Sequence, residues 1–271
     1  MSGPGRLPVI AAELTRLGLR FLIMGGHAVR HHGVDRNTLD YDLHLGLAGF
    51  AELAATLAKS LRLAAMIQGE GPSWRPRDFR RFVVGRLPDG QEERLEFWRT
   101  NHLLPPFEEA WARRETAGAE GVALNFLSLP DLLRSKETER ESDWQDLALL
   151  EEIHDARLLA RGAGHPSSRV LAALRSQRGY ATARAAGWLD EPALEADAWS
   201  LARHPVSAAF LAAGRPAAAE DHRLPATFGR ALATAQPGTA RHLALVEAVR
   251  RHWKAACVAA DRADKERCLA D

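Results

Sequence analysis

The stretch from residue 20 to residue 45 constrains the fold of this chain more than any other. An apolar run meets the glycine pair Gly25-Gly26, and a short helical segment follows. A second apolar run then contains Asp40 and Asp42. We interpret this order as strand, tight glycine turn, helix and strand. Because successive side chains of a strand alternate between its faces, the two aspartates are expected on one face, roughly 6.6 Å apart along the backbone.

Two carboxylates placed in this way can share hard cations. Mg²⁺ prefers octahedral oxygen ligation and keeps several waters, which suits two convergent carboxylates together with substrate phosphates. The alternative is that Asp40 and Asp42 lie on the solvated face of an edge strand. Strands are depleted in aspartate, so an aspartate pair flanked by Leu39, Tyr41 and Leu43 favours the cation site.

The glycine pair followed by Arg36-x-Thr38-x-Asp40-x-Asp42 resembles the signature of the nucleotidyltransferase superfamily, which has the polymerase-beta-like fold. The fuller string, from Gly25 to Arg36, is most similar to minimal and AbiEii-type nucleotidyltransferases, a branch that includes toxins of toxin–antitoxin pairs. The resemblance implies an α+β fold with helices packed on a mixed β-sheet. It also implies transfer of a nucleoside monophosphate from an NTP to an acceptor, with pyrophosphate released, two Mg²⁺ ions held by the aspartates, and a cognate antitoxin as a candidate partner.

A third carboxylate follows in a predicted hairpin, whose strands span residues 79–87 and 92–98. Glu96 lies between two apolar residues and resembles the third carboxylate of the superfamily, which completes a metal site or takes the proton of the acceptor hydroxyl. The family position is often aspartate, and glutamate reaches one methylene further. The alternatives are a sheet residue in a salt bridge, with Arg94 as partner, and a catalytic role for Glu92 instead.

The glycine pair and the residues before Asp40 are predicted to bind nucleotide. Gly25 and Gly26 let the backbone approach a ligand closely, and amide groups at the start of a helix can bind phosphate oxygens. The alternative is a simple tight turn. Thr38 is expected to form a local hydrogen bond, and Arg36 to contact a carboxylate or a phosphate.

Ser128 to Asp131 form a capping box that predicts the start of a helix. That helix carries Lys136, Arg140, Asp143 and Asp146 at helical spacing, so they are expected on one stripe. The stripe resembles the helical signature after the core of minimal nucleotidyltransferases. The resemblance implies that Lys136 contacts the triphosphate and that Arg140, Asp143 and Asp146 orient it. A solvated, salt-bridged helix face is the alternative.

The resemblance divides the chain into parts. Residues 1–128 correspond to the nucleotidyltransferase core, and residues 129–161 to a helical extension that completes the nucleotide site. Residues 167–271 are rich in Ala, Arg and Leu and predict an α-helical C-terminal domain, which the resemblance does not cover.

The composition limits the location and partners of the chain. With 36 basic and 35 acidic residues among 271, the net charge is about +1, so a nucleic-acid site would have to be a local patch. Cys257 and Cys268 show neither metal-binding nor disulfide spacing, which fits a reducing cytoplasm. No stretch is apolar enough to span a membrane, and no membrane partner is expected. His31 and His32 are expected at a helix end rather than on a metal.

The acceptor stays open between an RNA 3′ end, a protein hydroxyl and a small molecule such as an aminoglycoside. A cluster of arginines beside Trp74 favours RNA, because cations can contact phosphates and an aromatic ring can stack on a base; a solvated loop is the alternative. The cluster consists of Arg75, Arg77, Arg80 and Arg81. A further alternative is a non-catalytic module of the same fold that binds a nucleotide or a partner.

Overall fold

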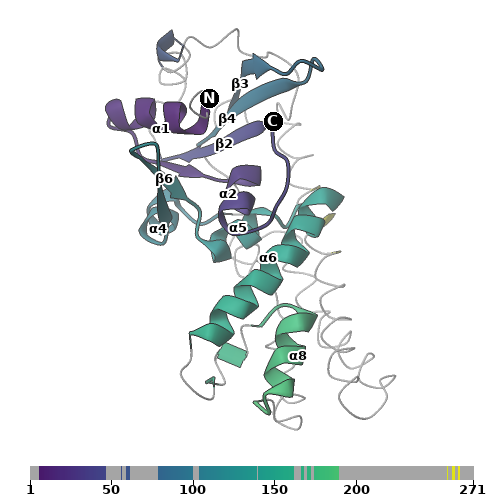
Figure 1. Cartoon of the computed structure of the whole chain (residues 1–271). Coiled ribbons are helices and arrows are strands. Elements are labelled where there is room, and N and C mark those ends of the chain that lie inside the picture. Colours follow the sequence, from purple (N-terminus) through teal and green to yellow (C-terminus); the bar gives the residue numbers. More distant parts are fainter. Residues whose placement is uncertain are drawn as a thin grey trace. The chain divides into compact units, whose positions relative to one another are not determined.

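A six-stranded mixed β-sheet forms the centre of the N-terminal part of the chain in a computed structural model (Figure 1). The strand order is β3-β4-β2-β1-β6-β5. The strands are β1 (Phe21–Ile23), β2 (Asp40–Leu45), β3 (Phe79–Arg86), β4 (Glu92–Trp98), β5 (Glu115–Ala119) and β6 (Val122–Phe126). The pairs β1–β6 and β2–β4 are parallel and the other three are antiparallel, so the predicted mixed sheet with packed helices is confirmed.

The structure describes five long segments of the chain and several short ones. They are residues 6–46, 56, 59–61, 79–99, 104–138, 140–161, 166–167, 170–171, 174–188, 255, 258–259 and 262. The described residues fall into two compact units, one up to Ser135 and one from Lys136 onward. The predicted boundaries after residues 128 and 161 stay predictions. Most of residues 167–271, including both cysteines, lies outside the described residues.

The helices of the N-terminal unit are α1 (Arg6–Arg16), α2 (Gly25–His31), α4 (Phe107–Ala112) and α5 (Leu129–Ser135). One side of α1 buries Leu7, Ile10 and Leu14, which recur at helical spacing. The chain leaves α1 through Gly18, whose φ of +70° suits a residue without a Cβ. The helix α2 packs against β2 and α5 (Figure 1).

The hairpin of β5 and β6 was predicted only in part. The residues of its second strand, Val122–Phe126, include apolar residues that favour a strand, whereas β5, with the sequence Glu-Thr-Ala-Gly-Ala, contains few such residues. The two strands meet at Glu120 and Gly121, whose φ values of +52° and +78° are those of a tight two-residue hairpin turn. The pairing with β6 therefore makes a strand of a segment that has little intrinsic preference for one.

One helix predicted from the sequence is in fact two. Ser128 caps the helix as predicted, since its Oγ accepts a hydrogen bond from the Asp131 amide and donates one to the Asp131 carboxylate. However, α5 ends at Ser135 and the next helix, α6 (Glu141–Ala160), begins six residues later. Thr138 explains the break, because its hydroxyl accepts a hydrogen bond from the Arg140 amide at 3.0 Å and so competes with a continuous helical backbone. The single stripe from Lys136 to Asp146 was therefore wrong.

In the second unit, α6 packs against α8 (Gln177–Ala185) (Figure 1). A small apolar core joins them, formed by Leu159, Leu171, Leu174, Tyr180 and Ala183. Asp155, which is fully buried, accepts hydrogen bonds from the Arg175 and Ser176 amides and from the Ser176 hydroxyl. None of the described helices combines the length and apolar character needed to cross a membrane.

Candidate functional site

The three predicted carboxylates lie on one face of the sheet, in two neighbouring strands. β2 and β4 run parallel, and Asp42 pairs in register with Glu96. Residues that pair across neighbouring strands have side chains on the same face, about 4.8 Å apart. Asp40 lies two residues before Asp42 in β2 and therefore shares its face. The structure thus brings together the carboxylates that the sequence suggested as metal ligands.

Glu96 is already paired with an arginine of the sheet. Its Oε1 atom lies 2.6 Å from both Nε and Nη2 of Arg81, which is its register partner in β3. Both side chains are largely buried, with exposed fractions of 8% for Glu96 and 14% for Arg81. The salt bridge considered for Glu96 exists, but its partner is Arg81 rather than Arg94. Arg94 instead lies 3.7 Å from Glu92, the alternative third carboxylate.

The glycine pair provides room for two side chains of the site. A Cβ atom on Gly25 would overlap Asp42 Oδ2 and lie only 2.6 Å from its Cγ, and Gly25 has a φ of +59°. A Cβ atom on Gly26 would overlap Thr38 Oγ1 and lie 2.6 Å from its Cβ. Glycine is therefore required at residue 25 by both backbone conformation and packing, and at residue 26 by packing. Phosphate binding by these two residues stays a prediction.

The segment before β2 holds the other two predicted nucleotide ligands. The expected local hydrogen bond of Thr38 is present, from its hydroxyl to the Asp40 carbonyl at 3.4 Å. Arg36 donates from Nε to the Asn37 carbonyl at 3.3 Å. Both residues line an open groove of about 660 Å³ at the start of β2 and β4. The remaining lining residues are Asn37, Leu39, Asp40, Arg86, Gly90, Gln91, Glu92 and Arg94.

This groove combines charge with direct access to Asp40. Three arginines, Arg36, Arg86 and Arg94, face two carboxylates, Asp40 and Glu92. The excess of positive charge suits a ligand with phosphate or carboxylate groups. The hairpin turn between β3 and β4 supplies one wall of the groove. The groove therefore depends on contacts between segments about 50 residues apart, which no local sequence pattern predicts.

His27 directly follows the glycine pair and contacts Tyr41 of β2, and the sequence pattern did not single out either residue. Their rings stack, with centroids 4.8 Å apart and an angle of 13° between the planes. Burial, aided by the nearby Arg30 charge, lowers the pKa of His27 to about 4, so its imidazole is neutral near pH 7. Burial also raises the pKa of Tyr41 to about 12, together with its hydrogen bond to Glu93 at 3.0 Å. The adjacent Gly-Gly-His sequence was the available signal for His27.

In the second unit, Lys136 holds two of the predicted orienting residues. Its Nζ atom lies 2.8 Å from Asp143 Oδ1 and 2.8 Å from Asp146 Oδ2, and all three side chains are at least nine-tenths buried. Arg140 is largely exposed and lies 3.5 Å from Asp143. These residues therefore meet, although the helix expected to align them is broken. A contact between Lys136 and a triphosphate stays a prediction.

Part of the predicted acceptor cluster can be placed. Arg80 and Arg81 lie in β3; the former donates to the Phe79 carbonyl at 2.7 Å, and the latter binds Glu96. Trp74, Arg75 and Arg77 lie outside the described residues. A role for the cluster in RNA binding therefore stays a prediction, and Arg81 belongs structurally to the carboxylate face.

Comparison with solved structures gives several similarities, among them two weak ones. No protein-family model and no curated protein sequence matches the chain. The structure is similar to that of an antigenic nucleotidyltransferase-like protein from Paracoccidioides brasiliensis, with a TM-score of 0.42 and 20% identity over 72% of this chain and 90% of that one. It is also similar to JHP933 from Helicobacter pylori, with a TM-score of 0.36 and 13% identity over 99% of this chain and 100% of that one. Neither similarity is strong enough to identify an activity for this chain.

Proposed function

We propose that the chain is a Mg²⁺-dependent nucleotidyltransferase, which moves a nucleoside monophosphate from an NTP to an acceptor. One observation carries the proposal: Asp40, Asp42 and Glu96 share one face of two parallel strands, and Gly25 packs directly against the Asp42 carboxylate. Carboxylates that share one face of neighbouring strands repel one another, although Arg81 offsets the charge of Glu96. Such a set is expected to persist where it binds cations.

The donor set fits Mg²⁺. Its members are carboxylate oxygens, the ligands that hard cations prefer, and an adjoining open groove leaves space for water and phosphate ligands. Asp40 and Asp42 would hold the ions, and Glu96 would complete the set by exchanging part of its contact with Arg81. When bound, Mg²⁺ neutralises charge on the phosphates and on the attacking and leaving oxygens.

The chain itself would bind and orient the reactants. The acceptor oxygen forms a bond to the α-phosphorus, the bond between that phosphorus and the leaving pyrophosphate breaks, and the hydroxyl proton passes to a carboxylate, for which Glu96 is the candidate. Arg36 and Arg94 line the groove beside Asp40 and would hold phosphate oxygens there. Catalysis would come mainly from positioning and charge neutralisation.

For the acceptor we favour an RNA 3′ end or a protein hydroxyl, modified in the cytoplasm by the toxin of a toxin–antitoxin pair. The sequence resemblance to AbiEii-type enzymes supports this choice. A small-molecule acceptor, of the aminoglycoside kind, is supported by the groove volume of about 660 Å³, which is typical of small-ligand sites. A non-catalytic nucleotide-binding module is supported by the Arg81–Glu96 pair, which already neutralises one carboxylate.

The proposal is tested by transfer of label from each of the four α-labelled NTPs, with Mg²⁺, to total RNA, cell extract or aminoglycosides. The wild-type chain is expected to label one acceptor class. Asp40→Asn/Asp42→Asn should lose transfer and Mg²⁺ binding while keeping its fold, because the substitutions remove charge and preserve shape. Asp35→Asn, an exposed residue outside the groove, is the matched control. Transfer that survives the double substitution would contradict the assignment, and Mg²⁺-dependent NTP binding without transfer would favour the non-catalytic module.

A further inference from the structure

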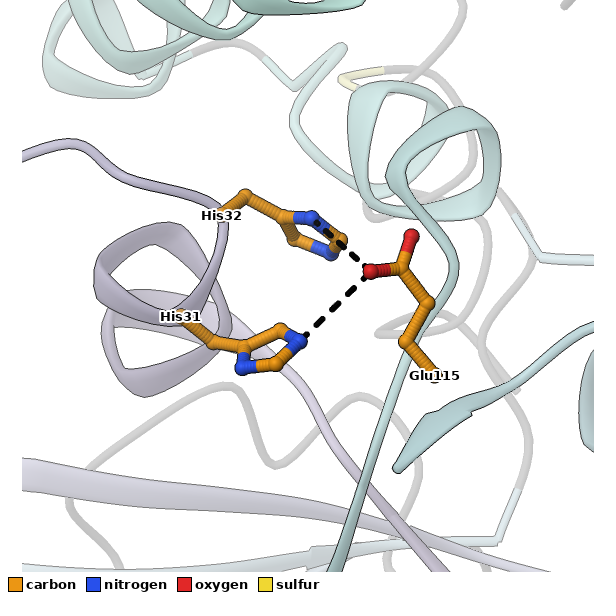
Figure 2. Close-up of side chains that lie close together, drawn as sticks. All are labelled: His31, His32 and Glu115. Atoms are coloured by element: carbon orange, nitrogen blue, oxygen red, sulfur yellow. Dashed lines mark ion pairs between the residues drawn. The ribbon is translucent and has the colours of Figure 1, made fainter. Parts of the chain in front are cut away.

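Two histidines and a glutamate meet where the end of α2 faces the start of β5 (Figure 2). His31 is the last residue of α2, His32 caps that helix, and Glu115 is the first residue of β5. Glu115 Oε2 lies 3.6 Å from His31 Nε2 and 3.8 Å from His32 Nδ1. Figure 2 shows both rings beside the Glu115 carboxylate, with dashed lines joining these nitrogens to one of its oxygens. The three ligand atoms all lie within 4.8 Å of one another.

The hydrogen bond of His32 fixes which of its nitrogens faces Glu115 with a lone pair. Its Nε2 atom lies 2.8 Å from the Leu127 carbonyl oxygen, which can only accept, so Nε2 carries the proton. In the neutral form of this ring the lone pair is then on Nδ1, the nitrogen that lies 3.8 Å from Glu115 Oε2. Histidines that bind metals characteristically donate their other ring N–H to a carbonyl or carboxylate in this manner. His32 thus has the orientation of a metal ligand.

His31 is oriented by a different contact. Its ring stacks on Phe126 in β6, with centroids 3.9 Å apart and planes within 1° of parallel. This stacking keeps Nε2 directed at Glu115 rather than at solvent. Both histidines are thus held by the β6 side of the sheet, one through Phe126 and the other through the carbonyl of Leu127, the residue after it.

The two N···O distances are closer to those between ligands of one metal ion than to those of hydrogen bonds. A charge-assisted N–H···O bond is about 2.7–2.9 Å long, and both N···O distances exceed that by more than half an ångström. Ligands at about 2.0–2.1 Å from a tetrahedral Zn²⁺ lie roughly 3.3–3.5 Å from each other. The two N···O distances would have to shorten by only a few tenths of an ångström. The two histidine nitrogens, which lie within 4.8 Å of each other, would have to approach by up to about 1.4 Å through side-chain rotation.

We propose that His31, His32 and Glu115 form a second metal site, which takes a borderline transition-metal ion, Zn²⁺ above all. Two imidazole nitrogens and one carboxylate oxygen suit Zn²⁺, whereas Mg²⁺ prefers an all-oxygen set. Three protein ligands leave a fourth position for water. The site joins the C-terminal end of α2 to the β5–β6 hairpin. Its ion would stabilise the helix whose other end, Gly25, packs against Asp42.

This site is separate from the carboxylate face, at the opposite end of α2. The helix has seven residues, which corresponds to about 10 Å. The proposal does not depend on transferase activity, because its ligands, its ion and its readout all differ from those of the Asp40 and Asp42 face. The two sites can therefore be tested separately.

The test is calorimetric titration of the full-length, chelator-treated chain with ZnCl₂, in the Asp40→Asn/Asp42→Asn background so that the carboxylate face does not compete. We expect saturable binding of one Zn²⁺ and a melting temperature that rises with ZnCl₂ but not with the same concentration of MgCl₂. CoCl₂ should give the visible absorption of a low-coordinate Co²⁺ site.

Glu115→Gln and His31→Gln should each weaken Zn²⁺ binding by at least about tenfold, since even partners of ligands cost that much when removed. Both side chains are partly exposed, so these variants are expected to fold. Glu120→Gln, on the exposed turn of the same hairpin, is the matched control and should bind as before. No saturable Zn²⁺ binding, or binding unchanged in both Glu115→Gln and His31→Gln, would overturn the proposal and leave the cluster as an ion pair.

Discussion

Replacing Gly25 by alanine tests whether the glycine pair exists to accommodate Asp42. An alanine at a φ near +60° costs about 1–2 kcal/mol in backbone strain. The new Cβ would also overlap Asp42 Oδ2 and lie 2.6 Å from Cγ and 3.0 Å from Cβ, so the carboxylate must move. Overpacking of this kind costs about 1–3 kcal/mol more. We therefore expect Gly25→Ala to lower the free energy of unfolding by about 2–5 kcal/mol and to weaken Mg²⁺ binding.

Gly18→Ala is the matched control for this substitution. Gly18 has a similar φ of +70°, but a Cβ there would meet nothing within 4 Å. Gly18→Ala should therefore show the backbone strain alone, about 1–2 kcal/mol. Replacing glycine by alanine also stabilises the fold by restricting the unfolded chain, and this contribution to the unfolding free energy is the same for both variants. It therefore cancels when the two are compared. The difference in unfolding free energy then measures the overlap with Asp42.

The assay is urea-induced unfolding of both variants, each with and without Asp42→Ala. Removing the Asp42 carboxyl group deletes the two atoms closest to the new Cβ, so the extra cost of Gly25→Ala should largely disappear in that background. The reasoning is refuted if Gly25→Ala and Gly18→Ala cost the same within about 0.5 kcal/mol. It is also refuted if the cost of Gly25→Ala is independent of Asp42.

Two further predictions concern buried ionisable groups. Lys136→Met should destabilise the second unit by about 3–5 kcal/mol, because it leaves the buried carboxylates of Asp143 and Asp146 without their ammonium partner. Arg140→Met, at an exposed residue, is the control. Equal melting temperatures for the two variants would contradict the prediction. Since the pKa of His27 is lowered to about 4, the unfolded chain binds a proton between pH 6.5 and 4 that the folded chain does not. The free energy of unfolding should therefore fall as the pH drops across that range, by up to about 3 kcal/mol from His27. In His27→Gln the urea midpoint should depend less on pH. A pH dependence equal to that of the wild type would refute this prediction.

Local patterns determined the elements that carry the candidate carboxylate site. The glycine pair between two apolar runs predicted the first strand, the helix and the second strand, and the alternation of side chains placed Asp40 and Asp42 on one face. The hairpin turn at Gly90, with a φ of +86°, and the capping box at Ser128 were also readable. These features depend on residues within a few positions of one another, so the sequence contains their whole physical cause.

Other features depend on pairings that no local window contains. The strand β5 exists because β6 pairs with it, although its own residues favour strands poorly. The helix from Ser128 is limited in a different way: it stops at Ser135, shortly before a local hydrogen bond from the Arg140 amide to Thr138 that competes with a continued helix. Such competition between local propensity and alternative hydrogen bonds is decided by small free-energy differences, which the residue pattern alone does not rank.

The sequence by itself therefore determined the strand–helix–strand unit and the chemical type of its site, a set of carboxylates behind a glycine turn. Only the tertiary structure decided the partners of those groups: Arg81 on Glu96, the arginine-lined groove beside Asp40, and Glu115 against His31 and His32. The physical reason is that each of these contacts joins segments separated by tens of residues or held in neighbouring strands. Their geometry follows from sheet order and register, which are fixed by packing of the whole unit.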